Sequence, residues 1–289
     1  MKERSLISLF QVPEARRAAM VAEGLQALAE HVEALVTDAR TLWDARRHRS
    51  AKIIDLLATE QAGAALILFD LVRAGKLRND RPAKLCKRFY DHRTRAIYAA
   101  AYTAALVDLN EAQDFADLYR DDLCLDGPND VDWILRNELD HERESAMYVD
   151  LVDFGEGSPA PRWETPRQYL YTEGTSVPYR PSRAVTVLLA LNVIGLTSTA
   201  GVEATKAAWS SIDIESRRAI DWSEARALNK TVIAAHAAAS SSPIAYRREV
   251  VNHWLFPLTT VDFTKQRVKR ADLVKLRDKT LEAEYEYWL

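Results

Sequence analysis

The sequence predicts an all-α protein that consists of an N-terminal helix bundle and a C-terminal helical extension. Along most of the chain, apolar residues recur at steps of three and four, which is the spacing of one helix face. The 289 residues include only 9 glycines and 10 prolines, and such a composition favours helix. No segment shows the alternation of apolar and polar residues that is typical of strands, and no internal repeat is present.

The first two helices are predicted by long apolar stripes. We expect the first over about residues 14–47 and the second from a cap at Ser50 to Val72, with Gly75 as its stop. The third should run from Pro82 to about Leu109, with small residues over 99–105 for close packing. The stripe of the first helix contains Leu25, Leu28, Val32, Leu35, Val36, Ala39, Leu42 and Trp43.

A turn separates the next two predicted helices. A short helix over about 111–123 is followed by Asp126-Gly127-Pro128-Asn129, a sequence typical of turns. A long fourth helix is then expected over about 130–149. Together these segments form a predicted N-terminal domain over residues 1–155.

Glycine and proline crowd the next stretch, so we expect an irregular connector over residues 156–182. The C-terminal helical region then covers residues 183–289. Within it the periodicity predicts helices over about 182–196, 202–211 and 223–239. A break at Ser240-Ser241-Ser242-Pro243 precedes a helix to about Leu255, and a charged final helix is expected over about 262–287.

Composition excludes several classes of protein. The formal net charge of −3 opposes broad non-specific binding of nucleic acid, which requires many cations. The two cysteines, Cys86 and Cys124, are too few for a disulfide framework or a zinc site. No apolar run reaches the roughly 18 residues that cross a bilayer. With no signal peptide apparent, we expect a cytoplasmic protein that does not bind membranes.

The candidate chemistry lies in Arg136-Asn137-Glu138-Leu139-Asp140-His141, an arginine followed by a polar amide and, five positions on, a histidine. An arginine can hold a phosphate with its fork of donors, and a histidine can move a proton near neutral pH. On a continuous helix this step turns the two side chains about 140° apart. They converge only if the helix begins between them, if it bends, or if a second subunit joins. Arg248 and His253 have the same spacing without the amide.

Three stretches resemble the AbiV family of bacterial abortive-infection proteins, which is grouped with the HEPN superfamily. They are residues 45–73 with Glu60 at their centre, Phe89 to Arg95, and the run Glu142 to Asp150 followed by Trp163-Glu164-Thr165-Pro166. The resemblance covers about residues 20–170 and none of residues 183–289. It implies a four-helix core that is usually dimeric, with the arginine–histidine motifs of two protomers meeting at the interface.

The resemblance implies a metal-independent endoribonuclease, and Arg136, Asn137 and His141 match its catalytic motif residue by residue. Glu60, on the neighbouring predicted helix, is the fourth candidate catalytic residue. Arg136 would hold the phosphate, His141 would act as base or acid, and Asn137 and Glu60 would orient them. The expected partners are single-stranded RNA, a second copy of the chain, and a phage or host protein as trigger. No cofactor is expected, since phosphate-binding loops and dinucleotide fingerprints are absent.

Other interpretations remain open. A non-catalytic helical protein that arrests growth by binding a partner fits the family equally well. His92 is expected to pack or cap a helix rather than to react. Glu138 and His141 form one E-x-x-H step, but a di-metal bundle needs a second such step. Basic residues near the C-terminus are expected to contact solvent or RNA phosphates, namely Lys265, Arg267, Lys269, Arg270, Lys275 and Arg277.

Overall fold

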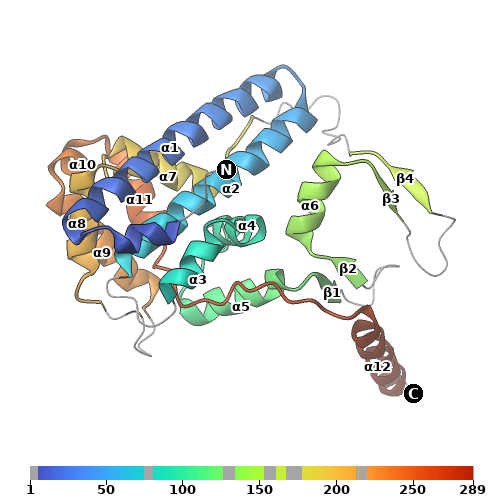
Figure 1. The fold of residues 1–289 in the computed structure, drawn as a ribbon. Helices are drawn as coiled ribbons and strands as arrows, with labels where there is room; N and C mark the ends of the chain where they lie inside the picture. The colour runs from blue at the N-terminus through green and yellow to red at the C-terminus, as the bar shows by residue number, and fades with distance from the viewer. Residues whose placement is uncertain are drawn as a thin grey trace.

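A computed structural model describes residues 6–74, 81–125, 134–152, 161–166, 178–212, 214 and 220–288. The described chain is built of helices, with two short strand pairs at one end (Figure 1). The predicted all-α class is confirmed. Gly75, the turn at 126–129 and most of the expected connector lie outside the described residues.

The longest helices, α1 (Glu14–Asp44) and α2 (His48–Arg73), pack side by side as a helical hairpin (Figure 1). Most of the predicted apolar stripe of α1 is buried between Leu25 and Ala39, and α2 is its main partner. The turn between them is short because Arg46 adopts a left-handed conformation with φ of 58°. Helix α2 begins before Ser50, so the predicted capping role of Ser50 is wrong.

The predicted third helix is two helices. A 3-10 turn, η1 (Leu6–Gln11), lies beside α3 (Arg81–Arg88), and α4 (His92–Ala101) follows after a break. The prediction of one continuous helix was wrong because the Asp91 side chain accepts a hydrogen bond of 2.7 Å from Thr94 N and starts a new helix. The break turns α4 across α2.

The predicted fourth helix, over about 130–149, is shorter than expected, because residues 134–136 form a strand. Helix α5 (Leu109–Arg120) leads into strand β1 (Leu123–Leu125), which pairs antiparallel with β2 (Ile134–Arg136). Only then does α6 (Glu138–Met147) begin, and β3 (Asp150–Val152) pairs with β4 (Arg162–Glu164) behind it. These strands have three residues each, too few to show an alternating pattern in the sequence.

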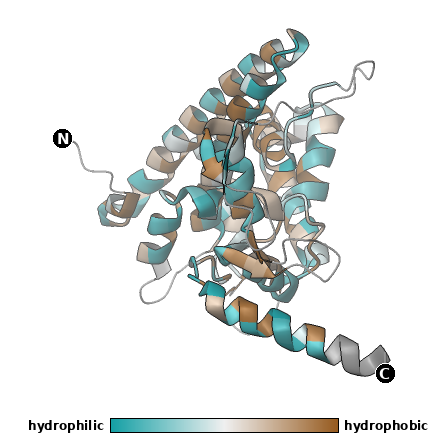
Figure 2. Cartoon of the chain, turned by 90° about the vertical axis from the view of Figure 1, so that its right-hand side faces the viewer, coloured by the Kyte–Doolittle hydropathy of each residue, from teal (hydrophilic) through white to brown (hydrophobic). Residues whose placement is uncertain are grey.

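The C-terminal helices cover the far end of the hairpin. They are α7 (Arg183–Val193), α8 (Thr199–Trp209), α9 (Trp222–Ala235), α10 (Ala237–Ser241) and α11 (Ile244–His253). Residues 254–269, here called the crossing segment, then run back across α5, and α12 (Arg270–Trp288) extends from the molecule (Figures 1 and 2). The expected helix over 262–269 is therefore wrong. Hydrogen bonds from the crossing segment to residues 120–122 hold it extended.

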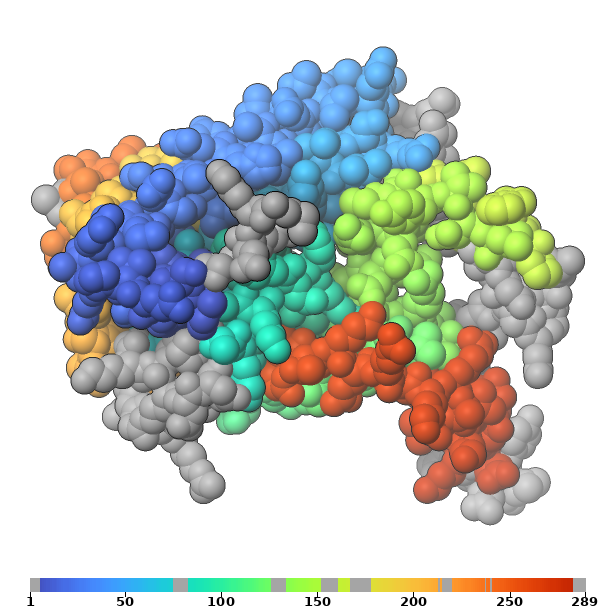
Figure 3. Space-filling model, in the orientation of Figure 1, coloured from blue at the N-terminus to red at the C-terminus, as the bar shows by residue number. Residues whose placement is uncertain are grey.

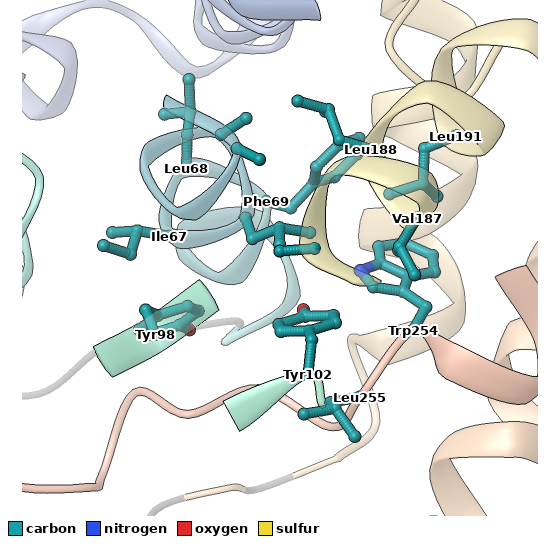
Figure 4. Packing of buried hydrophobic residues seen from close by; sticks show 14 of the residues in the cluster. Ile67, Leu68, Phe69, Tyr98, Tyr102, Val187, Leu188, Leu191, Trp254 and Leu255 are labelled. Carbon is teal, nitrogen blue, oxygen red and sulfur yellow. The ribbon is translucent and has the colours of Figure 1, made fainter. Parts of the chain in front are cut away.

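One hydrophobic core joins both halves of the chain. Figure 4 shows Phe69 of α2 between Leu188 of α7 and Trp254, with Tyr98 of α4 on the other side. Arg73 is fully buried within this core, between the rings of Trp209 and Trp254 at 5.0 and 4.4 Å. Its charge is balanced by Asp70, with which it forms an ion pair.

The surface view places the crossing segment along the lower edge of the body, with α12 protruding beyond it (Figure 3). Among the described residues, no helix combines the length and the apolar character that a membrane span requires.

Candidate functional site

Glu60 lies at the centre of a group of charged side chains from α2, α4 and α6. Its side chain is only 7% exposed. Oε2 lies 2.7 Å from Nδ1 of His92, and Oε1 accepts a hydrogen bond of 3.1 Å from Nε of Arg143. A buried carboxylate requires such partners, so a single residue of α2 joins the start of α4 to the middle of α6. We call Glu60, His92 and Arg143 the Glu60 cluster.

The imidazole of His92 contacts Glu60 through Nδ1 and is largely exposed to solvent. His92 is the first residue of α4, and its side chain is 58% exposed. An ionised carboxylate can only accept hydrogen bonds, so Glu60 favours the tautomer with the proton on Nδ1. Nε2 of the neutral ring then carries a lone pair that can accept a proton. The expected capping role of His92 is wrong, because Asp91 is the cap, whereas the contact of His92 with Glu60 does join α4 to α2.

Helix α6 is held in place through the face that carries Asp140 and Arg143, one turn apart. Asp140 forms ion pairs with Arg93 of α4 at 3.5 Å and with Lys265 of the crossing segment at 3.7 Å. The neighbouring Glu142 pairs with Lys52 of α2 at 2.6 Å. Three separate elements therefore fix the helix that carries the predicted motif.

The helix begins inside the motif. Arg136 ends β2, Asn137 is the N-cap of α6, and His141 lies in the first turn of the helix. The separation of about 140° that a continuous helix would impose therefore does not apply. A helix that begins between Arg136 and His141 is one of the three conditions under which the two side chains can converge, and the described chain satisfies it.

Asn137 is a structural part of this site. It is 2% exposed, and its Oδ1 accepts from the backbone N–H groups of Leu139 and Asp140. Its Nδ2 donates to the carbonyls of Tyr119 at 2.7 Å and Asp121 at 3.0 Å. Both ends of the Asn137 amide therefore form hydrogen bonds with the backbone, and these bonds set the position at which α6 starts.

Arg136 lies at the end of β2, just before α6, and His141 lies in the first turn of the helix. The Arg136 guanidinium forms an ion pair with Glu144, and its side chain is 57% exposed. Glu144 follows His141 by three residues, so the two project from neighbouring positions on the helix. The imidazole of His141 is exposed, and it makes no side-chain hydrogen bond or ion pair within the described part of the chain.

The structure therefore separates the four predicted site residues into two groups. Glu60 contacts His92 and Arg143, whereas the prediction from the sequence was that it would orient Arg136 or His141. Arg143 was not among the site residues predicted from the sequence, although it lies in the family-like run 142–150. Only its position relative to Glu60 in space, on a different helix, shows its role.

The second arginine–histidine match lies apart from this site, on α11. His253 Nε2 is 3.9 Å from Glu249. Burial lowers the pKa of His253, opposed by the Glu249 carboxylate and assisted by the Arg183 guanidinium. Within the described residues, no three side chains of the histidine, cysteine, aspartate and glutamate types gather as a metal site would require. Glu138 and His141 therefore have no third ligand there.

Comparison with family models matches residues 20–173 to the model HEPN_AbiV, described as AbiV. More than half of the chain is matched, and this range contains the Glu60 cluster as well as Arg136, Asn137 and His141. Searches of curated proteins and of solved structures returned no match.

Proposed function

Because the chain belongs to the AbiV family, which is of the HEPN type and associated with abortive infection, we propose that it acts against phage by cleaving RNA without a metal ion. The observation that carries this proposal is the Glu60 cluster. It joins a largely exposed imidazole and a guanidinium to the same carboxylate. Proton transfer and phosphate binding, the two requirements of RNA cleavage, thus lie side by side.

The reaction in this proposal is attack by the ribose 2′-hydroxyl on the adjacent phosphorus. His92 Nε2 accepts the hydroxyl proton as the new P–O bond forms, and the P–O5′ bond breaks. A protonated histidine, for which we propose His141, supplies a proton to the leaving O5′. The products are a 2′,3′-cyclic phosphate and a free 5′-hydroxyl. Arg143 and Arg136 are proposed to balance the charge on the non-bridging oxygens.

Each remaining group has a supporting role in the proposal. Glu60 selects the tautomer and orientation of His92, and Asn137 sets the start of α6 and so places His141. The chain is proposed to act as a homodimer, in which His141 of one protomer completes the site of its partner. Single-stranded RNA is the proposed substrate, because its flexible backbone can bring the 2′-hydroxyl in line with the P–O5′ bond, which the regular backbone of a duplex does not allow.

The test is cleavage of a labelled single-stranded RNA by purified protein in EDTA, with identification of the product ends. We expect cyclic phosphate ends and losses of about 100-fold or more in His92→Ala and His141→Ala proteins, the usual range for removal of a general acid or base. His31→Ala, which alters an exposed histidine on α1, is the matched control. Full cleavage by His141→Ala or His92→Ala would remove that residue from the mechanism.

A second function is favoured by the charges around α6. Its first turns contain Glu138, Asp140, Glu142 and Glu144, and Glu144 forms an ion pair with Arg136. The carboxylates of Asp140, Glu142 and Glu144 neutralise the cations beside them, which weakens the attraction for phosphates and suits a protein that arrests growth by binding a phage or host partner. The two functions are distinguished by expressing Arg136→Ala and His92→Ala proteins in phage-challenged cells. Protection that survives both substitutions supports binding, and its loss with retained folding supports catalysis.

A further inference from the structure

A groove runs between α9 and α11, in the C-terminal region outside the family match. Its volume is about 490 Å³. It lies at the end of the molecule opposite α6, so it is separate from the Glu60 cluster (Figure 1). Nine residues line it, namely Arg226, Lys230, Ile233, Ala234, Ile244, Arg247, Arg248, Val251 and Asn252.

The lining residues form one stripe on each helix. On α9 they follow Arg226 at steps of four, seven and eight, and on α11 they follow Ile244 at steps of three, four, seven and eight. These are the positions of a single helix face. The two walls are fixed to each other, because the buried Asn229 of α9 donates a hydrogen bond of 2.7 Å to the carbonyl of Trp254 at the end of α11.

The charge of the groove is of one sign. Four of its lining residues are cations and none is a carboxylate, in a chain whose net charge is −3. Within the described residues, none of the four is paired with an acidic side chain, and Nε of Arg226 and of Arg247 has no hydrogen-bond partner. The groove therefore concentrates positive potential for an anionic ligand.

The apolar residues that line the groove are aliphatic. They are Ile233, Ala234, Ile244 and Val251, and Ile244 is 60% exposed. Unstacked nucleic-acid bases bind mainly on aromatic rings, and no aromatic residue lines this groove. Aliphatic residues on both of two packed helices instead match the apolar face of a third helix.

We propose that the α9–α11 groove binds an amphipathic helix of a partner protein, with carboxylates on both sides of its apolar stripe. The apolar stripe would cover Ile244 and Val251, and the carboxylates would pair with Lys230, Arg247 and Arg248. This site assigns a role to the region outside the family match. It does not depend on RNA cleavage.

The test uses the full chain and a fluorescein-labelled synthetic helix with leucine at three- and four-residue steps and glutamate at the flanking positions. We expect the fluorescence anisotropy to show saturable binding. Binding should weaken at least tenfold, about 1.4 kcal/mol, in the Lys230→Glu/Arg247→Glu protein and also in Ile244→Ser. The matched control is Lys275→Glu/Lys279→Glu, which makes the same charge change on exposed positions of α12.

A charge exchange separates a direct contact from misfolding. A peptide with lysine in place of glutamate should bind the Lys230→Glu/Arg247→Glu protein and not the original one. The proposal is overturned if the acidic peptide does not bind, or if it binds the reversed variant equally well. It is also overturned if a labelled single-stranded oligonucleotide, and not the peptide, loses affinity in that variant, since the groove would then be a nucleic-acid site.

Discussion

Gly63 of α2 lies so close to Arg95 of α4 that a Cβ added to it would be 2.3 Å from the Arg95 carbonyl oxygen. This contact lies one turn from both partners of the catalytic proposal, since Glu60 precedes Gly63 by three residues and His92 precedes Arg95 by three. The absence of a side chain at Gly63 therefore allows Glu60 and His92 to reach each other.

Gly63→Ala should separate α2 from α4. Alanine favours helix, but the clash is with backbone and cannot be relieved by a rotamer change, so we expect a net loss of about 1–3 kcal/mol in the free energy of unfolding. If the proposed function holds, RNA cleavage should fall as well. Gly24→Ala is the matched control, because its Cβ would meet only the tip of Leu68, at 3.3 Å. Equal unfolding midpoints for the two variants in urea would contradict this account.

Asn137→Ala should release the start of α6. It removes the cap and leaves the carbonyls of Tyr119 and Asp121 without their donor, which we expect to cost roughly 2 kcal/mol. Asn137→Asp keeps the capping oxygen but turns a buried carboxylate oxygen toward the two carbonyls. We expect this variant to unfold at a lower urea concentration than the original protein at pH 7, and to recover part of the difference when the carboxylate is protonated. A stability of Asn137→Asp equal to that of the original protein would show that the Nδ2 contacts are unimportant.

Arg46→Gly should stabilise the turn between α1 and α2. A left-handed conformation costs an L-residue roughly 1 kcal/mol and glycine almost nothing, and Arg46 has φ of 58°. We therefore expect a gain of about 0.5–1 kcal/mol in the free energy of unfolding. The neighbouring Ala45 has φ of −77°, so Ala45→Gly should lower the stability instead. Destabilisation by both substitutions would argue against the left-handed turn.

Cys86 should be unreactive in the folded protein. Its side chain is buried, and burial raises the pKa of the thiol to about 11. At pH 8 about one molecule in a thousand would carry the reactive thiolate. A Cys124→Ser protein, in which Cys86 is the remaining cysteine, should therefore react with Ellman's reagent only after unfolding. Labelling of the native variant at the rate of a free thiol would show that the α3 region opens readily.

The sequence predicted the helices that depend on local pattern. The apolar stripe from Leu25 to Ala39 alone indicates α1, because a helix of that length must bury one face whatever its partner is. The motif residues Arg136 and His141 were likewise found by spacing, and the resemblance to AbiV proteins agrees with the matched family.

The errors arose where a short local contact, or a contact distant in the sequence, interrupts a helical pattern. The cap at Asp91 divides one predicted helix into α3 and α4. The pairing of β2 with β1 shortens another and turns Asn137 into a cap. The crossing segment is extended because backbone groups of residues 120–122 bind Gln266. The hydropathy pattern along the chain does not reveal any of these contacts.

By itself, the sequence determined the helical class, the long hairpin and the residue types available for chemistry, since these follow from periodicity and composition. Only the tertiary structure decided which of those residues meet. Glu60, His92 and Arg143 are separated by 32 and 51 positions in the chain, and they come together because Gly63 lets α4 approach α2 and because Asn137 starts α6 beside them. The physical reason is that side-chain chemistry acts over a few ångströms in space, a distance that helix packing sets.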